Sequence, residues 1–205
     1  MSKARILAEA RKIFGGSGYA EANLRTIAAA VGIKTPSLYA HFPSKAALFE
    51  AVYAEVIVEH TAYFKDLVRA STQLPPLERL GQLLGGIEAY YRERPDLAEF
   101  SLRAAVAEYG PGGRGLREVF LQSESDLATA VRETYDAGVA SGEFGGGESE
   151  PFTALVFVVM EGLFLQLTHY SPEVYRERFD LAWRHLSQLL TSSRDDSPKD
   201  SYELQ

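Results

Sequence analysis

The chain has 205 residues, 46% of them hydrophobic, so it can bury a core of its own. The absence of cysteine excludes a disulfide framework, a thiol nucleophile and a thiolate metal site, and it fits a reducing cytosol. The net charge of −7 argues against a protein that binds nucleic acid over its whole surface.

The first two predicted helices are short. Residues 6–14 place apolar side chains at helical spacing, and a glycine-rich run at residues 15–18 closes this helix. Asn23 is a good N-cap for the second helix, and Gly32 ends it.

A third short helix follows. Thr35 offers a capping hydroxyl directly before Pro36, and the helix is expected to run to about Phe42. A tight helix-turn-helix needs small residues where its helices cross, a glycine at the turn, and apolar residues that lock the second helix. The chain supplies these at Ala28, Ala29, Ala30, Gly32, Ile33 and Leu38. In such a motif the second helix enters the major groove of DNA.

The charge of the chain is distributed unevenly. Residues 1–50 hold seven basic and three acidic side chains, so this segment carries +4 and residues 51–205 carry −11. The asymmetry indicates a small basic head that can meet phosphates, on a larger acidic body with another purpose.

Pro43 and Ser44 open a long fourth helix, and five more helices are predicted after it. Proline or glycine separates them at residues 75–76, 94–96, 110–113, 142–147 and 171–172. The expected fold is all-α with about nine helices. We predict a DNA-binding domain at residues 1–47, a helical bundle for ligand binding and dimerisation at residues 48–192, and a disordered tail at residues 193–205.

The run from Ile27 to Phe49 resembles the DNA-binding signature of the TetR family of repressors. It ends Gly-Ile-Lys-Thr-Pro-Ser-Leu-Tyr-Ala-His-Phe-Pro-Ser-Lys-Ala-Ala-Leu-Phe, and the specific part is Leu-Tyr-x-His-Phe followed by Ser-Lys-x-x-Leu-Phe. The first helix also matches, with Ile-x-x-Ala-x-x-x-Phe before Gly-Tyr. The close match covers about the first 50 residues; beyond them, only length and helical organisation agree.

The resemblance implies which side chains meet DNA. Residues of the turn and third helix would face bases or the adjoining backbone, while Tyr39, His41 and Lys45 would bind phosphates. The complete predicted set is Arg25, Lys34, Thr35, Pro36, Ser37, Tyr39, His41 and Lys45. Two departures from the family pattern are Ala47, where a glutamate often completes a capping box, and Ala40, which offers no side chain to a base.

The last two helices are expected to pair with those of a second copy, as the resemblance implies. Residues 154–160 are apolar around the whole helix, which fits an internal core on one side and a dimer seam on the other. The predicted interface residues are Leu155, Val158, Val159, Phe179, Trp183 and Leu186. The alternative is that both helices only fill a monomer core.

A ligand pocket is expected among aromatic and polar side chains of the body. The predicted lining residues are Tyr63, Tyr90, Phe100, Arg103, Phe120, Glu124, Glu161 and Phe164. Glu161 interrupts the most apolar helix, and a buried carboxylate there needs a partner. The alternative for Glu161 is a solvated helix edge or an internal pair. No cofactor and no metal are predicted.

The sequence thus predicts a homodimeric transcription regulator, a repressor that a small-molecule effector releases from a palindromic operator in double-stranded DNA. The alternative is a DNA-binding regulator without a ligand, controlled by abundance or by a protein partner. An enzyme is not expected, because the four histidines lie in unrelated settings. The N-terminus lacks a secretory signal and residues 152–167 are too short for a comfortable membrane span, so a cytoplasmic protein is expected.

Overall fold

The computed structural model describes residues 2–106 and 113–192, and within them every regular element is a helix. The nine helices are α1 (Lys3–Glu21), α2 (Leu24–Val31), α3 (Thr35–Tyr39), α4 (Lys45–Ala70), α5 (Pro76–Arg92), α6 (Pro95–Val106), α7 (Gly113–Ser141), α8 (Ser149–His169) and α9 (Pro172–Thr191). The predicted all-α fold is confirmed. The expected tail at residues 193–205 lies outside the described residues.

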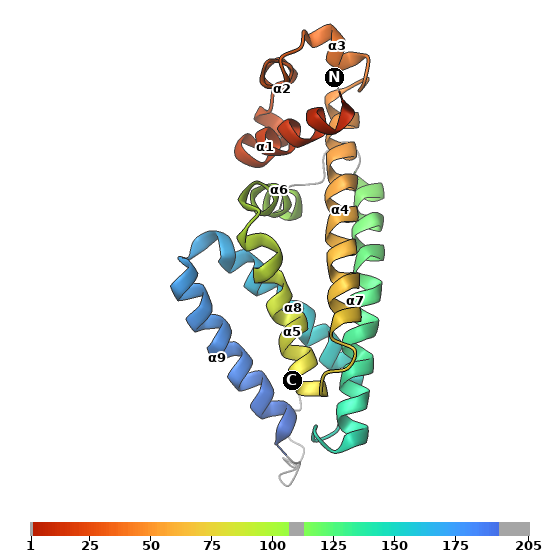
Figure 1. Ribbon diagram of the computed structural model, residues 1–205, viewed down its shortest axis with the longest axis vertical. Coiled ribbons are helices and arrows are strands. Elements are labelled where there is room, and N and C mark those ends of the chain that lie inside the picture. The colour runs from red at the N-terminus through yellow and green to blue at the C-terminus, as the bar shows by residue number, and fades with distance from the viewer. Residues whose placement is uncertain (1, 107–112, 193–205) are drawn as a thin grey trace, which may run out of the picture.

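Helices α1 to α3 form a small head at one end of the molecule, and α5 to α9 form a larger body (Figure 1). Helix α4 runs from the head into the body. The head has a shared core, because helices this short are not stable alone. Its fully buried side chains are Ile6, Ala10, Ile27, Val31, Leu38 and Leu48.

Local capping fixes where several helices begin. The side chain of Asn23 accepts a hydrogen bond from the backbone N–H of Arg25 at 2.8 Å, as expected of the N-cap of α2. The hydroxyl of Ser44 accepts from the backbone N–H of Ala47 at 3.0 Å and caps α4 without a glutamate partner. Both predicted caps are confirmed.

Three predicted boundaries were wrong. Thr35 already lies inside α3, because the carbonyl of Lys34 accepts the helical bond from the backbone N–H of Ser37 at 2.9 Å. The same helix ends earlier than predicted, at Tyr39. Helix α1 continues past the first glycines and changes direction only at Gly18, where φ is +79°.

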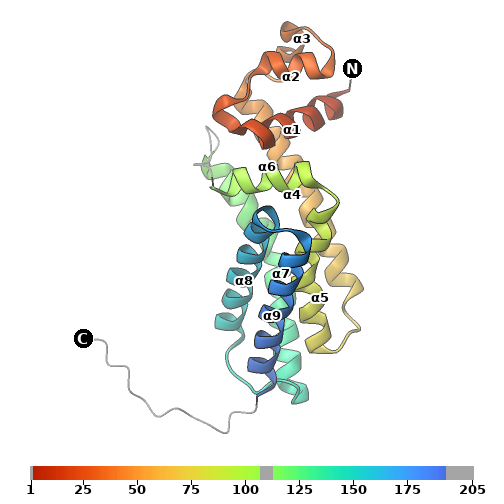
Figure 2. The same ribbon diagram turned by 90° about the vertical axis from the view of Figure 1, so that its left-hand side faces the viewer.

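The body is built around α4, α5, α7 and α8. Helix α4 packs against α5 and α7, which both pack against α8, and α9 lies beside α8 and against α5 (Figure 2). Apolar side chains between these helices form the body core. Its members include Phe64, Leu83, Ile87, Leu127, Val131, Val156 and Met160.

Helix α6 lies between α1 and the rest of the body (Figure 1). The two helices approach at Gly15, where an added Cβ would lie 3.1 Å from the backbone nitrogen of Phe100. Because glycine has no side chain, the backbones of α1 and α6 can come into contact there. Phe100 also reaches α4, with its ring centre 5.5 Å from that of Phe49.

Polar side chains tie α6 to the head as well. Nη2 of Arg103 donates to the carbonyl of Gly16 at 2.9 Å. Nε of Arg11, on α1, donates to the carboxylate of Asp96, on α6, at 3.1 Å. Helix α6 is therefore the part of the body to which α1 is most directly attached.

Candidate DNA-binding surface and ligand cleft

The turn between α2 and α3 sets the direction of the short third helix. Gly32 takes a left-handed conformation with φ +79°, which residues with a side chain rarely adopt. The backbone N–H of Ile33 donates to the carbonyl of Ala28 at 2.9 Å and closes the turn. Leu38 is completely buried and holds one side of α3 against the head. The opposite side of α3 is thereby turned outward.

The predicted DNA contacts gather around this outward side. Those that are exposed are Arg25, Lys34, Pro36, Ser37, Tyr39 and His41, while Thr35 and Lys45 are half-buried. Tyr39 is 51% exposed, whereas a tyrosine that served only for packing would be more buried. Within the described residues, the side chains of the exposed set form no hydrogen bond or ion pair, so their polar groups are free to meet phosphate or base edges.

Lys45 differs from the other members of this set. Its Nζ donates to the carbonyls of Ala20 and Ala22 at 3.0 and 3.1 Å and lies 4.6 Å from the centre of the Tyr19 ring. These contacts join the start of α4 to the end of α1. A phosphate contact for Lys45 stays a prediction, and any phosphate would have to share or displace these partners.

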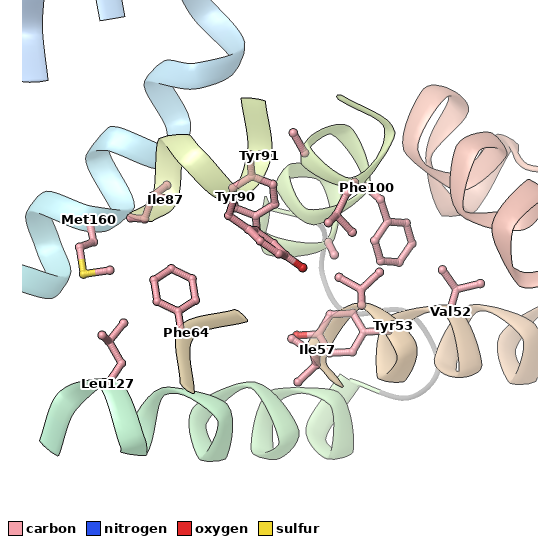
Figure 3. Close-up of a cluster of buried hydrophobic side chains, with 14 of the residues drawn as sticks. Val52, Tyr53, Ile57, Phe64, Ile87, Tyr90, Tyr91, Phe100, Leu127 and Met160 are labelled. Atoms are coloured by element: carbon pink, nitrogen blue, oxygen red, sulfur yellow. The ribbon is translucent and has the colours of Figure 1, made fainter. Parts of the chain in front are cut away.

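An aromatic cluster lies in the body beside α4 and α5 (Figure 3). His60 is at its centre, with its ring 4.6 Å from that of Phe64 and 5.4 Å from that of Tyr90. Burial lowers the pKa of His60 to about 4, so the imidazole is neutral at pH 7. His60 is not among the pocket residues that the sequence predicts.

The structure brings only some of the predicted ligand residues together. Tyr63 and Tyr90 join the aromatic cluster, with ring centres 4.8 Å apart, and Phe164 joins it through Tyr91. Phe100 lies instead at the contact between α6, α4 and the head. The predicted lining therefore divides among separate places.

Phe120, Glu124 and Glu161 lie on α7 and α8, outside the aromatic cluster. Phe120 is half-buried and packs against the core. Burial, and then the charge of Glu161, raises the pKa of Glu124 to about 7. Glu161 itself is exposed. The carboxyl groups of Glu124 on α7 and Glu161 on α8 are thus close enough to interact.

A cleft of about 670 Å³ opens where α1, α5, α6, α8 and the start of α9 meet. This volume is in the range of small-molecule sites. Arg103 is the one predicted ligand residue that lines it. Tyr91, Leu102 and Leu167 add apolar wall, and Tyr175 lines the cleft while being 1% exposed.

The comparison with known families bears on the head. Residues 6–52 match the model of the bacterial regulatory proteins of the tetR family. The N-terminal domain belongs to the TetR family. The matched residues span α1 to α3 and the first turns of α4, and they contain the turn at Gly32 and the outward side of α3.

Solved structures show that the TetR-like fold extends over more than nine-tenths of the chain. A TetR transcription regulator from Haloarcula marismortui is 17% identical, with a TM-score of 0.72 over 92% of this chain and 97% of that one. A transcriptional regulator from Rhodococcus sp. Rha1 is 19% identical, with a TM-score of 0.72 over 94% and 99%. FadR from Bacillus subtilis, solved with stearoyl-CoA, is 14% identical, with a TM-score of 0.65 over 93% and 98%. No curated protein matches the chain.

In this TetR-like body, the predicted dimer residues fall into two groups. Leu155 and Val158 of α8 are exposed, Val158 at 65%, and Val159 is half-buried. By contrast, Leu186 is buried, and Phe179 and Trp183 of α9 pack against the core of their own chain. Sequence reasoning had assigned this inward stripe of α9 to the partner, since periodicity does not show which neighbour a stripe meets.

Helix α9 exposes other apolar side chains that sequence reasoning passed over. Leu181 and Leu189 are exposed, Leu189 at 74%. Together with Leu155, Val158 and Leu165 of α8 they form what we call the outer face of the body. Among the described helices, α8 is also the one that is long and apolar enough to cross a membrane, a test that core helices of soluble proteins pass as well. One side of α8, including Val156 and Met160, is already buried in this body.

Proposed function

We propose that this TetR-family protein is a homodimeric repressor that reads a palindromic DNA operator through α3. The observation that carries the proposal is the outward side of α3, where Ser37, Tyr39 and His41 are exposed while Leu38 anchors the helix from behind. Short polar side chains at the start of such a helix can reach base edges, and a tyrosine hydroxyl can donate to a phosphate. The +4 charge of residues 1–50 favours the approach of this end to DNA.

The outer face of the body supports the dimer. Val158 and Leu189 would be solvated in a single chain, and large exposed apolar patches mark association surfaces. A twofold pairing through this face would hold two heads side by side, and two recognition helices about one DNA turn apart read a palindrome.

Release by a small molecule completes the proposed function. FadR from Bacillus subtilis was solved with stearoyl-CoA, so one protein of this fold binds an acyl thioester. For the present chain, an effector in the body would favour an arrangement in which the two heads no longer fit the operator. By linkage, operator DNA would weaken effector binding by the same factor.

The DNA-binding step is tested by selection from a random-sequence duplex pool, with mobility shift across a salt series. We expect the protein to enrich a palindrome, and Arg25→Ala with Tyr39→Phe to weaken binding by about tenfold and to reduce the salt slope by about one. Lys12→Ala is the matched control, because Lys12 also lies on the head but its ammonium group pairs with Glu9 at 3.0 Å. Failure to enrich any sequence, or equal losses in variant and control, would refute the proposal.

The release step needs a separate experiment. A metabolite library is screened for compounds that free the enriched duplex from the protein, and we expect at least one class to do so. A duplex that no compound releases would instead favour control by abundance or by a protein partner.

A further inference from the structure

Tyr175, one of the residues that line the cleft beside α6, has a buried hydroxyl group without a partner among the described residues. Tyr175 is 1% exposed, and its phenolic oxygen makes no hydrogen bond within the described part of the chain. Burial and the nearby charge of Glu88 raise the pKa of Tyr175, so the group stays protonated and can donate. A buried donor that has lost water without gaining an acceptor is costly to the fold. An acceptor oxygen supplied from the cleft would remove that cost.

The charged groups around the cleft are already balanced. The lining contains Glu88 and Arg92 of α5 and Glu99 and Arg103 of α6. Arg92 donates to Glu88, and Arg103 donates to the carbonyl of Gly16. With two groups of each sign, the lining has no net charge, which favours an uncharged ligand. Its remaining walls are apolar, with aromatic and aliphatic side chains from α5, α6, α8 and α9.

Helix α6 lines the cleft and also packs against α1 of the head. One side of α6 presents Leu102 and Arg103 to the cleft. The same helix contacts α1 through Phe100, whose backbone lies against Gly15, and through the bond from Arg103 to Gly16. Gly16 itself lines the cleft. A molecule in the cleft would thus contact both the body and the end of α1.

We propose that this cleft is the effector site. It takes an uncharged molecule with an apolar body and one hydrogen-bond-accepting oxygen, such as a ketone or ester carbonyl. Its occupancy acts on the head through α6 and α1. The hydroxyl of Tyr175 donates to that oxygen. A molecule in the cleft shifts Arg103, and the hydrogen bond from Arg103 to the carbonyl of Gly16 passes this shift to α1. This inference rests on the proposed function only for its effect on DNA; binding in the cleft stands by itself.

Nile red is a suitable probe for binding, because it is uncharged, has an apolar aromatic body and a carbonyl oxygen, and fluoresces strongly only away from water. We expect saturable binding at one site per chain. Tyr175→Phe should weaken it roughly three- to tenfold, the loss of one hydrogen bond. Leu102→Trp, which adds bulk to the wall of the cleft, should weaken it as well. Tyr175→Phe should leave thermal stability equal or higher, because an unpartnered buried hydroxyl is removed, whereas a purely structural role would lower stability.

Tyr90→Phe is the matched comparison for the hydroxyl. Tyr90 is 2% exposed, and its phenolic oxygen also lacks a partner within the described residues, but it lies in the aromatic cluster and not in the lining of the cleft. A loss of affinity in Tyr90→Phe with none in Tyr175→Phe would place the probe in the aromatic cluster and overturn the proposal. Unchanged affinity in both Tyr175→Phe and Leu102→Trp would overturn it as well.

The coupling is measured by titrating the probe with and without a saturating amount of the enriched duplex. We expect the duplex to lower probe affinity, and Arg103→Met to reduce the ratio of the two affinities, a ratio in which any direct loss of probe binding cancels. A probe affinity that ignores the duplex would overturn the assignment as effector site. If the pool yields no duplex at all, the proposed function fails, and the titrations of the Tyr175 and Leu102 variants still decide whether the cleft binds.

Discussion

The head and the body of this protein differ in the exposure of their unpaired polar side chains. On the head, Ser37, Tyr39 and His41 are exposed, and they stay hydrated until a partner arrives. In the body, the hydroxyl groups of Tyr90 and Tyr175 are buried and lack hydrogen-bond partners among the described residues. Each such group costs the fold about 1–3 kcal/mol. The head is thus complete as a free protein, whereas the body has places that a second molecule would complete.

The largest effect is expected when Leu38, which holds α3 against the head, is truncated. Leu38→Ala leaves a cavity at a completely buried position, so we expect the free energy of unfolding to fall by about 3 kcal/mol and DNA binding to be lost with it. Denaturant unfolding measures the change. Val58→Ala is the control, because Val58 is exposed and its truncation should stay within about 0.5 kcal/mol. Equal effects would mean that Leu38 does not anchor the helix.

A charge on the outer face of the body tests what that face is for. Val158→Arg should place an unpaired charge in the proposed dimer seam and weaken dimerisation by about 3 kcal/mol, roughly 100-fold. Sedimentation at several protein concentrations checks it. The same substitution at Val58, an exposed site on α4, should leave the dimer intact. A Val158→Arg protein that remains dimeric would move the seam elsewhere.

His60 and Glu124, both in the body, should change the stability of the protein in opposite directions as the pH falls. The folded pKa of His60 lies near 4, below its ordinary 6.5, so its contribution to stability is complete above pH 6.5 and is lost as the pH falls towards 4. The folded pKa of Glu124 lies near 7, above its ordinary 4.5, so its contribution is complete below pH 4.5 and is lost as the pH rises through 7. Between pH 7.5 and pH 5 the contribution of His60 amounts to about 2 kcal/mol. That of Glu124 has the opposite sign and is smaller, about 1 kcal/mol, because solvent screens this partly exposed carboxyl.

Single variants separate these two contributions. When the pH is lowered from 7.5 to 5, the free energy of unfolding of His60→Gln should rise relative to that of the unsubstituted chain. That of Glu124→Gln should fall relative to it. Denaturant midpoints at the two pH values measure both changes. Parallel pH profiles in the two variants would show that the two environments have been misassigned.

The smallest effect is expected at the joint between head and body. Arg11 is only 18% exposed and bonds to Asp96 at 3.1 Å, so Arg11→Met should cost about 1 kcal/mol of unfolding free energy. Arg69→Met is the matched control, because Arg69 pairs with Asp66 at 3.2 Å but both side chains are largely exposed. We expect about 0.5 kcal/mol or less there. Equal losses would remove Arg11 from the joint.

Local chemistry made much of the head predictable. Asn23, Gly32 and Ser44 act within a few residues of themselves, so their roles could be inferred from the sequence and are confirmed. Thr35 was misassigned because two neighbouring residues could both begin the helix, and the backbone carbonyl of Lys34 does so. For Lys45, the carbonyls that it binds lie more than twenty residues away, beyond what a local pattern can show.

The body was harder to predict because its important relations are between distant helices. Trp183 and Phe179 form an apolar stripe, but only the fold shows that it meets α5 of the same chain near Gly81 and Gly85. Arg103 was predicted as a ligand residue and does line the cleft, whereas Tyr175, which also lines it, was not predicted. Nothing in the sequence around Tyr175 reveals that its hydroxyl is buried without an acceptor.

The bond between Lys45 and the end of α1 has a geometric consequence. It fastens the head to the first turn of α4, so that a swing of α4 carries the recognition helix with it. With 26 residues, α4 is about 39 Å long. A swing of only about 5° at its far end then displaces the head by about 3.4 Å, the rise of one base pair. Tilts that hardly disturb the packing of a helix can therefore put two paired heads out of step with the double helix.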